Sequence, residues 1–169
     1  SFWIVGQPNE IAAMRSVLMD NAAVVPHLTD DEYAYLRIRA GLGMLGYEWG
    51  EAYNPLEAGL LHLTSFAKGC YIGQEVVARL DSYNKVKQRI MGIIADEALS
   101  PTDVVVAPDG ASIGTVTSVT STLDGKHTLA LAYVRGEHAH PDTSLTVRTE
   151  RGDVTVRQVL PPLEDPSCP

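Results

Sequence analysis

Six runs rich in valine, isoleucine and threonine fill the second half of this 169-residue chain. Residues of these types favour β-strands, and turn signals such as Pro108-Asp109-Gly110 and Asp124-Gly125 separate several of the runs. Successive strands without intervening helices predict a small antiparallel barrel or sandwich, because such folds limit the exposed edges of a sheet. The expected strands cover residues 89–95, 104–107, 113–120, 128–134, 145–149 and 154–160.

Helical spacing replaces this pattern in the first 86 residues. Thr29 and Glu32 have the spacing of a capping box, in which each side chain bonds the backbone N–H of the other residue. The spacing predicts a helix from there to about Ala40, with Gly41 as its stop signal. An earlier helix is expected to open near Pro8, with apolar residues on one face at Ile11, Met14, Val17 and Leu18.

The first residues indicate that the sequence is a piece of a longer protein. Residues 2–6 have the composition of a strand, and a helical pattern follows directly. A single strand and helix cannot form a sheet, because the N–H and C=O groups of the strand need partners. The chain also begins without methionine. We therefore expect it to be the C-terminal part of its protein.

Charge and composition exclude some classes of function. The net charge is −8, so a basic surface for direct nucleic-acid binding is not expected. No apolar run approaches the roughly 18–20 residues that span a bilayer, so we expect no membrane partner. The two cysteines, Cys70 and Cys168, lie far apart and show no zinc-type spacing, so we predict no metal site. Free cysteines favour the reducing cytoplasm as location.

The densest chemistry lies in residues 68–75, which read Lys-Gly-Cys-Tyr-Ile-Gly-Gln-Glu. Gly69 and Gly73 predict a tight turn, and residues from Gln74 to about 83 have helical spacing. Cys70 would lie just before a helix N-terminus, where unpaired N–H groups and the nearby Lys68 favour a thiolate. The alternative is a small buried cysteine that fills a turn.

Other polar residues allow two interpretations each. Arg37 shares a helical face with Tyr33, either as a surface residue with a packed stem or as a pocket residue that grips a carboxylate. Glu57 follows Pro55 in a predicted helical turn, where complementing the helix dipole is the simpler role. His62 is expected to be packed among apolar residues, and the pair at 138 and 140 to lie in a loop.

Residues 68–75, followed by Ala78-Arg79, resemble the K-G-C-Y-x-G-Q-E…A-R signature of the folate-binding YgfZ-type proteins, which are relatives of the glycine cleavage T protein (aminomethyltransferase). The T protein usually carries aspartate at the position of Cys70, so the match favours the YgfZ branch. Residues 113–118 and 129–134 also resemble stretches of the T-protein family's C-terminal barrel. The resemblance spans most of residues 33–160.

The resemblance implies an α+β fold: a partial ferredoxin-like α/β segment followed by an antiparallel barrel of about six strands. Residues 1–86 would be the C-terminal part of the folate-binding α/β region, 87–162 the barrel and 163–169 a tail, with the chain expected to be frayed from Pro161 onward. Tetrahydrofolate would occupy a cleft between the two regions. Tyr33 would pack on the pterin, and Arg37 is a weaker candidate for a folate contact.

The same resemblance implies a role in assembling or repairing iron–sulfur clusters, with client or assembly proteins as partners. Cys70 would be the key residue, as nucleophile, transient ligand or partner contact. The other motif residues would shape or support it: Lys68, Gly69, Tyr71, Gly73, Gln74, Glu75 and Arg79.

Two other functions compete with this one, so whether the protein is an enzyme is open at this point. One is a one-carbon transferase of the aminomethyltransferase type. The presence of Cys70 in place of aspartate is evidence against it. The other is a protein-binding barrel with an inert cysteine.

Overall fold

The computed structural model describes residues 5–20, 28–65, 69, 73, 75 and 86–166. The chain divides into two compact units, Ser1–Tyr33 and Ala34–Pro169. The expected boundary at residue 86 stays a prediction.

The first unit contains one complete helix, α1 (Pro8–Asp20). The Gln7 carbonyl accepts the N–H groups of Glu10 and Ile11, and the Glu10 carboxylate in turn accepts the Gln7 N–H at 3.1 Å. None of the α1 residues is buried. The helix predicted near Pro8 is confirmed. The strand predicted over residues 2–6 falls mostly outside the described residues, and Val5 and Gly6 are not in a strand.

The capping box predicted at Thr29 is present and starts α2 (Asp30–Arg39). The Glu32 carboxylate accepts the Thr29 N–H at 2.7 Å, and the Thr29 hydroxyl accepts the Glu32 N–H at 3.2 Å. Two N–H groups of the first turn region, which have no partner inside a helix, are thereby satisfied. The helix ends at Arg39, and Gly41, two residues later, has a φ of 70°, the left-handed conformation of a helix stop.

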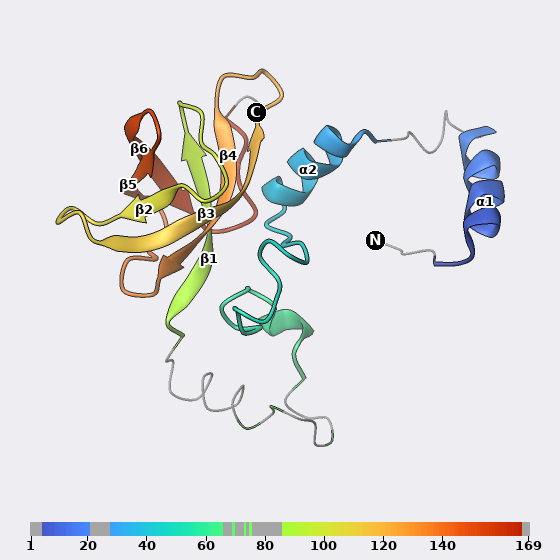
Figure 1. The fold of residues 1–169 in the computed structure, drawn as a ribbon, viewed down its shortest axis with the longest axis horizontal. Helices are drawn as coiled ribbons and strands as arrows, with labels where there is room; N and C mark the ends of the chain where they lie inside the picture. The colour runs from blue at the N-terminus through green and yellow to red at the C-terminus, as the bar shows by residue number, and fades with distance from the viewer. Residues whose placement is uncertain are drawn as a thin grey trace. The chain divides into compact units, whose positions relative to one another are not determined.

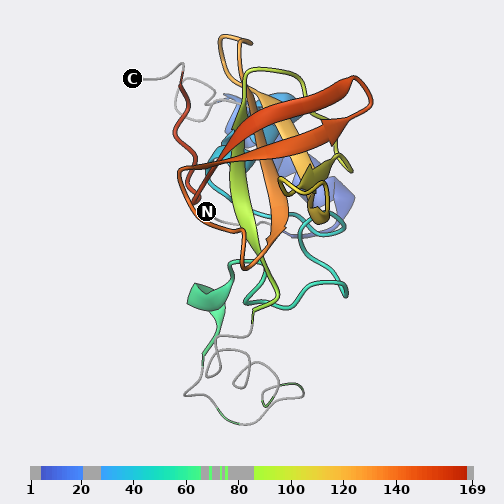
Figure 2. The ribbon, with the colours of Figure 1, turned by 90° about the vertical axis from the view of Figure 1, so that its left-hand side faces the viewer.

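All six predicted strands are present and close into an antiparallel barrel (Figure 1). The order around the barrel is β1-β4-β3-β2-β5-β6. In Figure 2 the hairpin of β5 and β6 runs across β1. Irregular registers interrupt β3 opposite β2 and again opposite β4. The strands are β1 (Gln88–Ala95), β2 (Val104–Val106), β3 (Ser112–Ser121), β4 (Thr128–Arg135), β5 (Thr143–Thr149) and β6 (Gly152–Val159).

Apolar side chains fill the barrel and also cover part of its outside. The inner cluster takes residues from every strand, among them Met91, Ile93 and Val105. A second cluster lies on the outer face, where Ile90, Ile94 and their neighbours on β4 and β6 pack with α2 and Leu163. Strands β1 and β4 are therefore buried on both faces, which explains their nearly continuous apolar sequences.

The segment after β6 returns to α2, so the prediction that the chain frays from Pro161 onward is wrong as far as Asp165. The Leu163 N–H donates to the Arg39 carbonyl at 2.7 Å, and the Leu163 side chain is 2% exposed. The Tyr35 hydroxyl donates to the buried Asp165 carboxylate at 2.5 Å. These bonds and the burial of Leu163 hold residues 161–165, called here the C-terminal strap, against the outer cluster.

Candidate functional site

A cleft of about 660 Å³ lies in the second unit, between residues 40–62 and the barrel. Strand β1, the loop after β4 and the end of β6 supply its barrel wall. Apolar side chains such as Leu56 and Ile90 share its lining with the polar Glu57. The resemblance to folate-binding proteins predicts that tetrahydrofolate lies in a cleft beside the barrel, and this cleft has such a position.

A buried polar hub centred on Glu48 holds the segment that forms one wall of this cleft. Glu48 is fully buried. Its Oε2 accepts the Met44 N–H at 3.0 Å and lies 3.3 Å from the Arg37 guanidinium. Its Oε1 accepts hydroxyl bonds of 2.6 Å from Thr117 and Ser118 on β3. Every charge in the hub is paired and hydrogen-bonded, as burial of an ion pair requires.

Arg37 belongs to this hub and not to the surface. It is 6% exposed, and besides Glu48 it donates to the Leu42 carbonyl at 2.8 Å and to Ser118 at 2.9 Å. The surface interpretation of Arg37 is therefore wrong. The interpretation in which it holds a carboxylate matches the structure, but that carboxylate belongs to its own chain. A folate contact by Arg37 stays a prediction, as does one by Tyr33, which is 49% exposed.

Two stacked tyrosine rings lie beside the hub and join residues 40–62 to β4. Tyr53 and Tyr133 have ring centroids 3.8 Å apart and nearly parallel planes. The Tyr133 hydroxyl donates to the Glu48 carbonyl at 2.8 Å. Burial raises the pKa of Tyr133 well above its ordinary value of 10.0, and the negative charge that Tyr53, Glu48 and Glu57 can carry raises it further. The phenol is thus held in its neutral, donating form.

Glu57 lies in a turn that Asn54 caps. The Asn54 side-chain oxygen accepts the N–H groups of Leu56 and Glu57 at 3.0 Å, and the Asn54 N–H donates to Glu57 Oε2 at 3.3 Å. Glu57 is 6% exposed and lines the cleft. Its expected role beside backbone N–H groups is consistent with this geometry, although its burial was not expected.

The structure contradicts the prediction for one of the three histidines considered, His62. His62 is exposed and lines the cleft, so the prediction that it is packed is wrong. His138 and His140 lie in the loop after β4, as expected. Among the described residues no group of three or more His, Cys, Asp or Glu side chains could hold a metal ion.

Most of the predicted thiol motif falls outside the described part of the chain: Lys68, Cys70, Tyr71, Gln74 and Arg79. Gly69, Gly73 and Glu75 are described and exposed. Gly73 has a φ of 91°, which glycine adopts at little cost. The helix predicted after Gln74 and the exposure of the Cys70 thiol therefore stay predictions.

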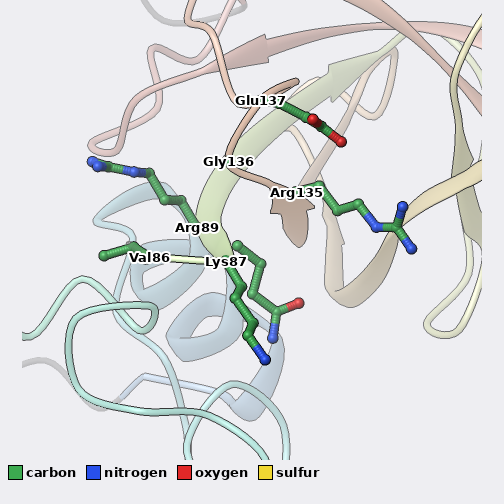
Figure 3. A pocket seen from close by; sticks show the side chains of 7 residues that line it. Val86, Lys87, Arg89, Arg135, Gly136 and Glu137 are labelled. Carbon is green, nitrogen blue, oxygen red and sulfur yellow. The ribbon is translucent and has the colours of Figure 1, made fainter. Parts of the chain in front are cut away.

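A second hollow, of about 670 Å³, lies where β1 begins and β4 ends. Lys87, Arg89 and Arg135 line it together with Glu137. Figure 3 shows Arg89 and Arg135 extending to opposite sides, with Lys87 and Glu137 also pointing apart. Because these charged ends diverge, we do not assign an anion site to this hollow.

Comparison with known proteins now adds to this geometry. Residues 88–165, which contain the barrel, match the glycine cleavage T-protein C-terminal barrel domain. Relatives with the name aminomethyltransferase also match this chain. Together these matches support the assignment of the chain to the glycine cleavage T-protein family. The barrel expected from the resemblance is thus confirmed, and the assignment to the YgfZ branch stays a prediction.

Two relatives match over more residues than the barrel domain contains. "Putative transferase At1g60990, chloroplastic" of Arabidopsis thaliana is 36% identical over 112 residues, which are 66% of this chain and 26% of that protein. A mitochondrial aminomethyltransferase of Gallus gallus is 28% identical over 119 residues, covering 69% of this chain and 30% of the relative. This chain thus spans about a quarter to a third of their length.

A solved structure has the same fold over most of the chain. The crystal structure of glycine cleavage system aminomethyltransferase T from Bartonella henselae superposes with a TM-score of 0.68 at 18% identity. The match covers 77% of this chain and 37% of that one. At this identity the likeness concerns the fold alone.

The hub residues that sequence reasoning missed are Glu48, Thr117 and Ser118. Thr117 and Ser118 lie in a stretch noted for its resemblance to the barrel, and Glu48 in a glycine-rich loop. A charged residue within an otherwise glycine-rich and apolar loop was the available signal. Its partners on β3 are about 70 positions away in sequence, so spacing alone does not reveal them.

Proposed function

We propose that this chain belongs to a tetrahydrofolate-binding protein of the T-protein family that acts in one-carbon transfer of the aminomethyltransferase type. The observation that carries the proposal is the cleft between residues 40–62 and a barrel that matches this family. Several relatives bear the name aminomethyltransferase. The cleft offers apolar walls to a flat heterocycle, and the hub around Glu48 keeps one wall in place.

Binding of 5-methyltetrahydrofolate, followed by NMR up to millimolar ligand, tests the ligand part of this proposal. We expect weak binding, because the cleft is open and the chain spans only about a third of the length of its relatives. Leu160 is an exposed residue of the cleft rim, so Leu160→Glu places a charge there without disturbing the core. This change should weaken binding about 10-fold, which corresponds to about 1.4 kcal/mol.

Leu123→Glu is the matched control, since Leu123 is also exposed and does not line the cleft. It should leave folate binding unchanged. Equal effects of the two substitutions, or no binding at millimolar ligand, would contradict a folate site in the cleft.

A second candidate is the iron–sulfur accessory role, which the cysteine at the centre of the 68–75 signature favours. The two functions differ in what they demand of Cys70. A transferase releases ammonia from an aminomethylated carrier in a folate-dependent reaction, and Cys70→Ser should leave that rate nearly unchanged. An accessory factor instead loses its support of iron–sulfur enzymes in a deletion strain when Cys70 becomes serine. Assays of both kinds with the complete protein separate the candidates.

A further inference from the structure

Glu57 is a buried carboxylate with unused bonding capacity. Its Oε2 accepts one bond, from the Asn54 N–H at 3.3 Å. Within the described part of the chain no donor bonds its Oε1, and Oε1 is not among the fully buried unpaired atoms, so it stays accessible from the cleft. Glu48 gives the internal comparison: it is buried to a similar degree and is bonded by four donors, one of them a guanidinium. Of the two carboxylates, only Glu57 lines the cleft.

A carboxylate in this position is costly unless something compensates its charge. Removal from water penalises an ionised carboxylate strongly, and a buried one is normally paired. No ion pair of 4.0 Å or less joins Glu57 to a described cation, whereas Arg37 serves Glu48 in this way. Because Glu57 lines an open cleft, a ligand can provide the missing donor.

We propose that the cleft binds an organic cation carried on a flat apolar body, with its ammonium or amidinium N–H groups donating to Glu57. Leu56, Ile90 and Trp49 line the same cleft and supply apolar surface for the body of the ligand.

The other charged or titratable groups that face the cleft restrict where the cation sits. These groups are Arg89, His62 and His140. All three repel a second positive group when charged, and Arg89 always is. The cationic end of the ligand therefore lies at Glu57, and the remainder of the ligand is neutral or anionic. The inference depends on the cleft and on Glu57 and holds whether or not tetrahydrofolate is the natural ligand.

Benzamidine and benzyl alcohol are suitable probes, because they share a phenyl ring and differ in charge. The 169-residue chain is titrated with each, and binding is followed by NMR through the shifts of the Leu56, Glu57 and Ile90 amides. Benzamidine should bind about 10- to 100-fold more tightly than benzyl alcohol, the range expected for a hydrogen bond to a charged group. Benzylamine, an ammonium on the same ring, distinguishes a preference for amidinium from a preference for any cation.

Glu57→Gln removes the charge and keeps the shape, so it should reduce benzamidine affinity to that of benzyl alcohol. Glu51→Gln makes the same change at an exposed carboxylate nearby and should alter neither affinity. Equal affinities of the two probes for the unmodified chain would overturn the proposal, and this comparison needs no variant to fold. A folded Glu57→Gln protein with undiminished preference for benzamidine would overturn it as well. Loss of folate binding with the benzamidine preference intact would count against the proposed function only.

Discussion

At the scale of single residues, the interior of the second unit depends on one ion pair. Arg37 and Glu48 lie 3.3 Å apart with almost no exposure, and the hydroxyls of Thr117 and Ser118 complete the bonding of the carboxylate. Isolated buried pairs are often no better than apolar residues, yet removing one partner leaves the other charged and unpaired. The hub is therefore stable only as a complete set.

Glu48→Gln should lower the free energy of unfolding by about 3–5 kcal/mol, because it leaves the Arg37 charge buried without a counter-charge. Urea denaturation followed by circular dichroism measures the change. Glu51→Gln, at an exposed position, should stay within about 0.5 kcal/mol of the unmodified chain. Similar stabilities for the two variants would show that the Arg37–Glu48 ion pair does not stabilise the fold.

Tyr133 makes stability depend on pH in the alkaline range. Its pKa in the folded chain is raised above the ordinary 10.0, chiefly by burial. A raised pKa means that the contribution of this residue is fully present below about pH 10 and is lost as the pH rises through the folded-state pKa. The free energy of unfolding should therefore fall above about pH 10, and Tyr133→Phe should flatten that fall.

Ultraviolet titration of phenolate absorbance gives an independent check. Tyr133 should ionise only as the chain unfolds, and this late phase should disappear in Tyr133→Phe. A phase that persists in the variant would assign the effect to another tyrosine.

At the scale of elements, the C-terminal strap packs onto the barrel through a glycine. A side chain at Gly92 on β1 would have its Cβ only 2.6 Å from Leu163 Cγ and 3.0 Å from Val159 Cγ2. The absence of a side chain at Gly92 is thus what lets Leu163 reach its buried position. The C-terminal strap and β1 therefore fit together at Gly92, although Leu163 lies 71 positions after Gly92 in the sequence.

Gly92→Ala should destabilise the chain by about 1–3 kcal/mol through overpacking, and Leu163→Ala by about 2–5 kcal/mol through loss of buried surface. Combined, they should cost at least about 0.5–1 kcal/mol less than the sum, because the new methyl group occupies space that Leu163 has left. Thermal and urea unfolding measure the cycle. Gly50→Ala is the control, since a Cβ there meets nothing within 4 Å. Strict additivity would contradict the contact.

The elements also show what the sequence could predict. All six strands were predicted within about two residues at either end, because β-branched runs between turn residues report local preference directly. The capping box of α2 was equally local. The strap was missed because Pro161 and Pro162 indicate an irregular chain and say nothing of where Leu163 packs. The choice between a surface and a pocket position for Arg37 could not be made from the sequence, because its partners Glu48 and Ser118 are brought to it only by the tertiary fold.

At the scale of the whole molecule, the candidate site belongs to one unit. The cleft, the hub and the strap all consist of residues between Tyr35 and Asp165, inside the unit Ala34–Pro169. The unit Ser1–Tyr33 contains α1, which buries none of its own residues. Helix α2 begins in the first unit and carries the buried Tyr35, Arg37 and Ile38 of the second, and the Thr29 cap satisfies an N–H group in its first turn.

This division predicts the outcome of two deletions. Removing residues 1–28 retains the Thr29 cap and every contact of the hub, so the free energy of unfolding should change by no more than about 0.5 kcal/mol. Ending the chain at Leu160 removes the strap, with Leu163 and the Asp165 partner of Tyr35, and should cost at least the 2–5 kcal/mol expected for Leu163→Ala alone. Benzamidine binding to the first deletion should equal that of the 169-residue chain, because the cleft begins at Ala40. If removal of residues 1–28 destabilised the barrel as much as loss of the strap, the two units would unfold as one, and the cleft could not be treated as the property of a single unit.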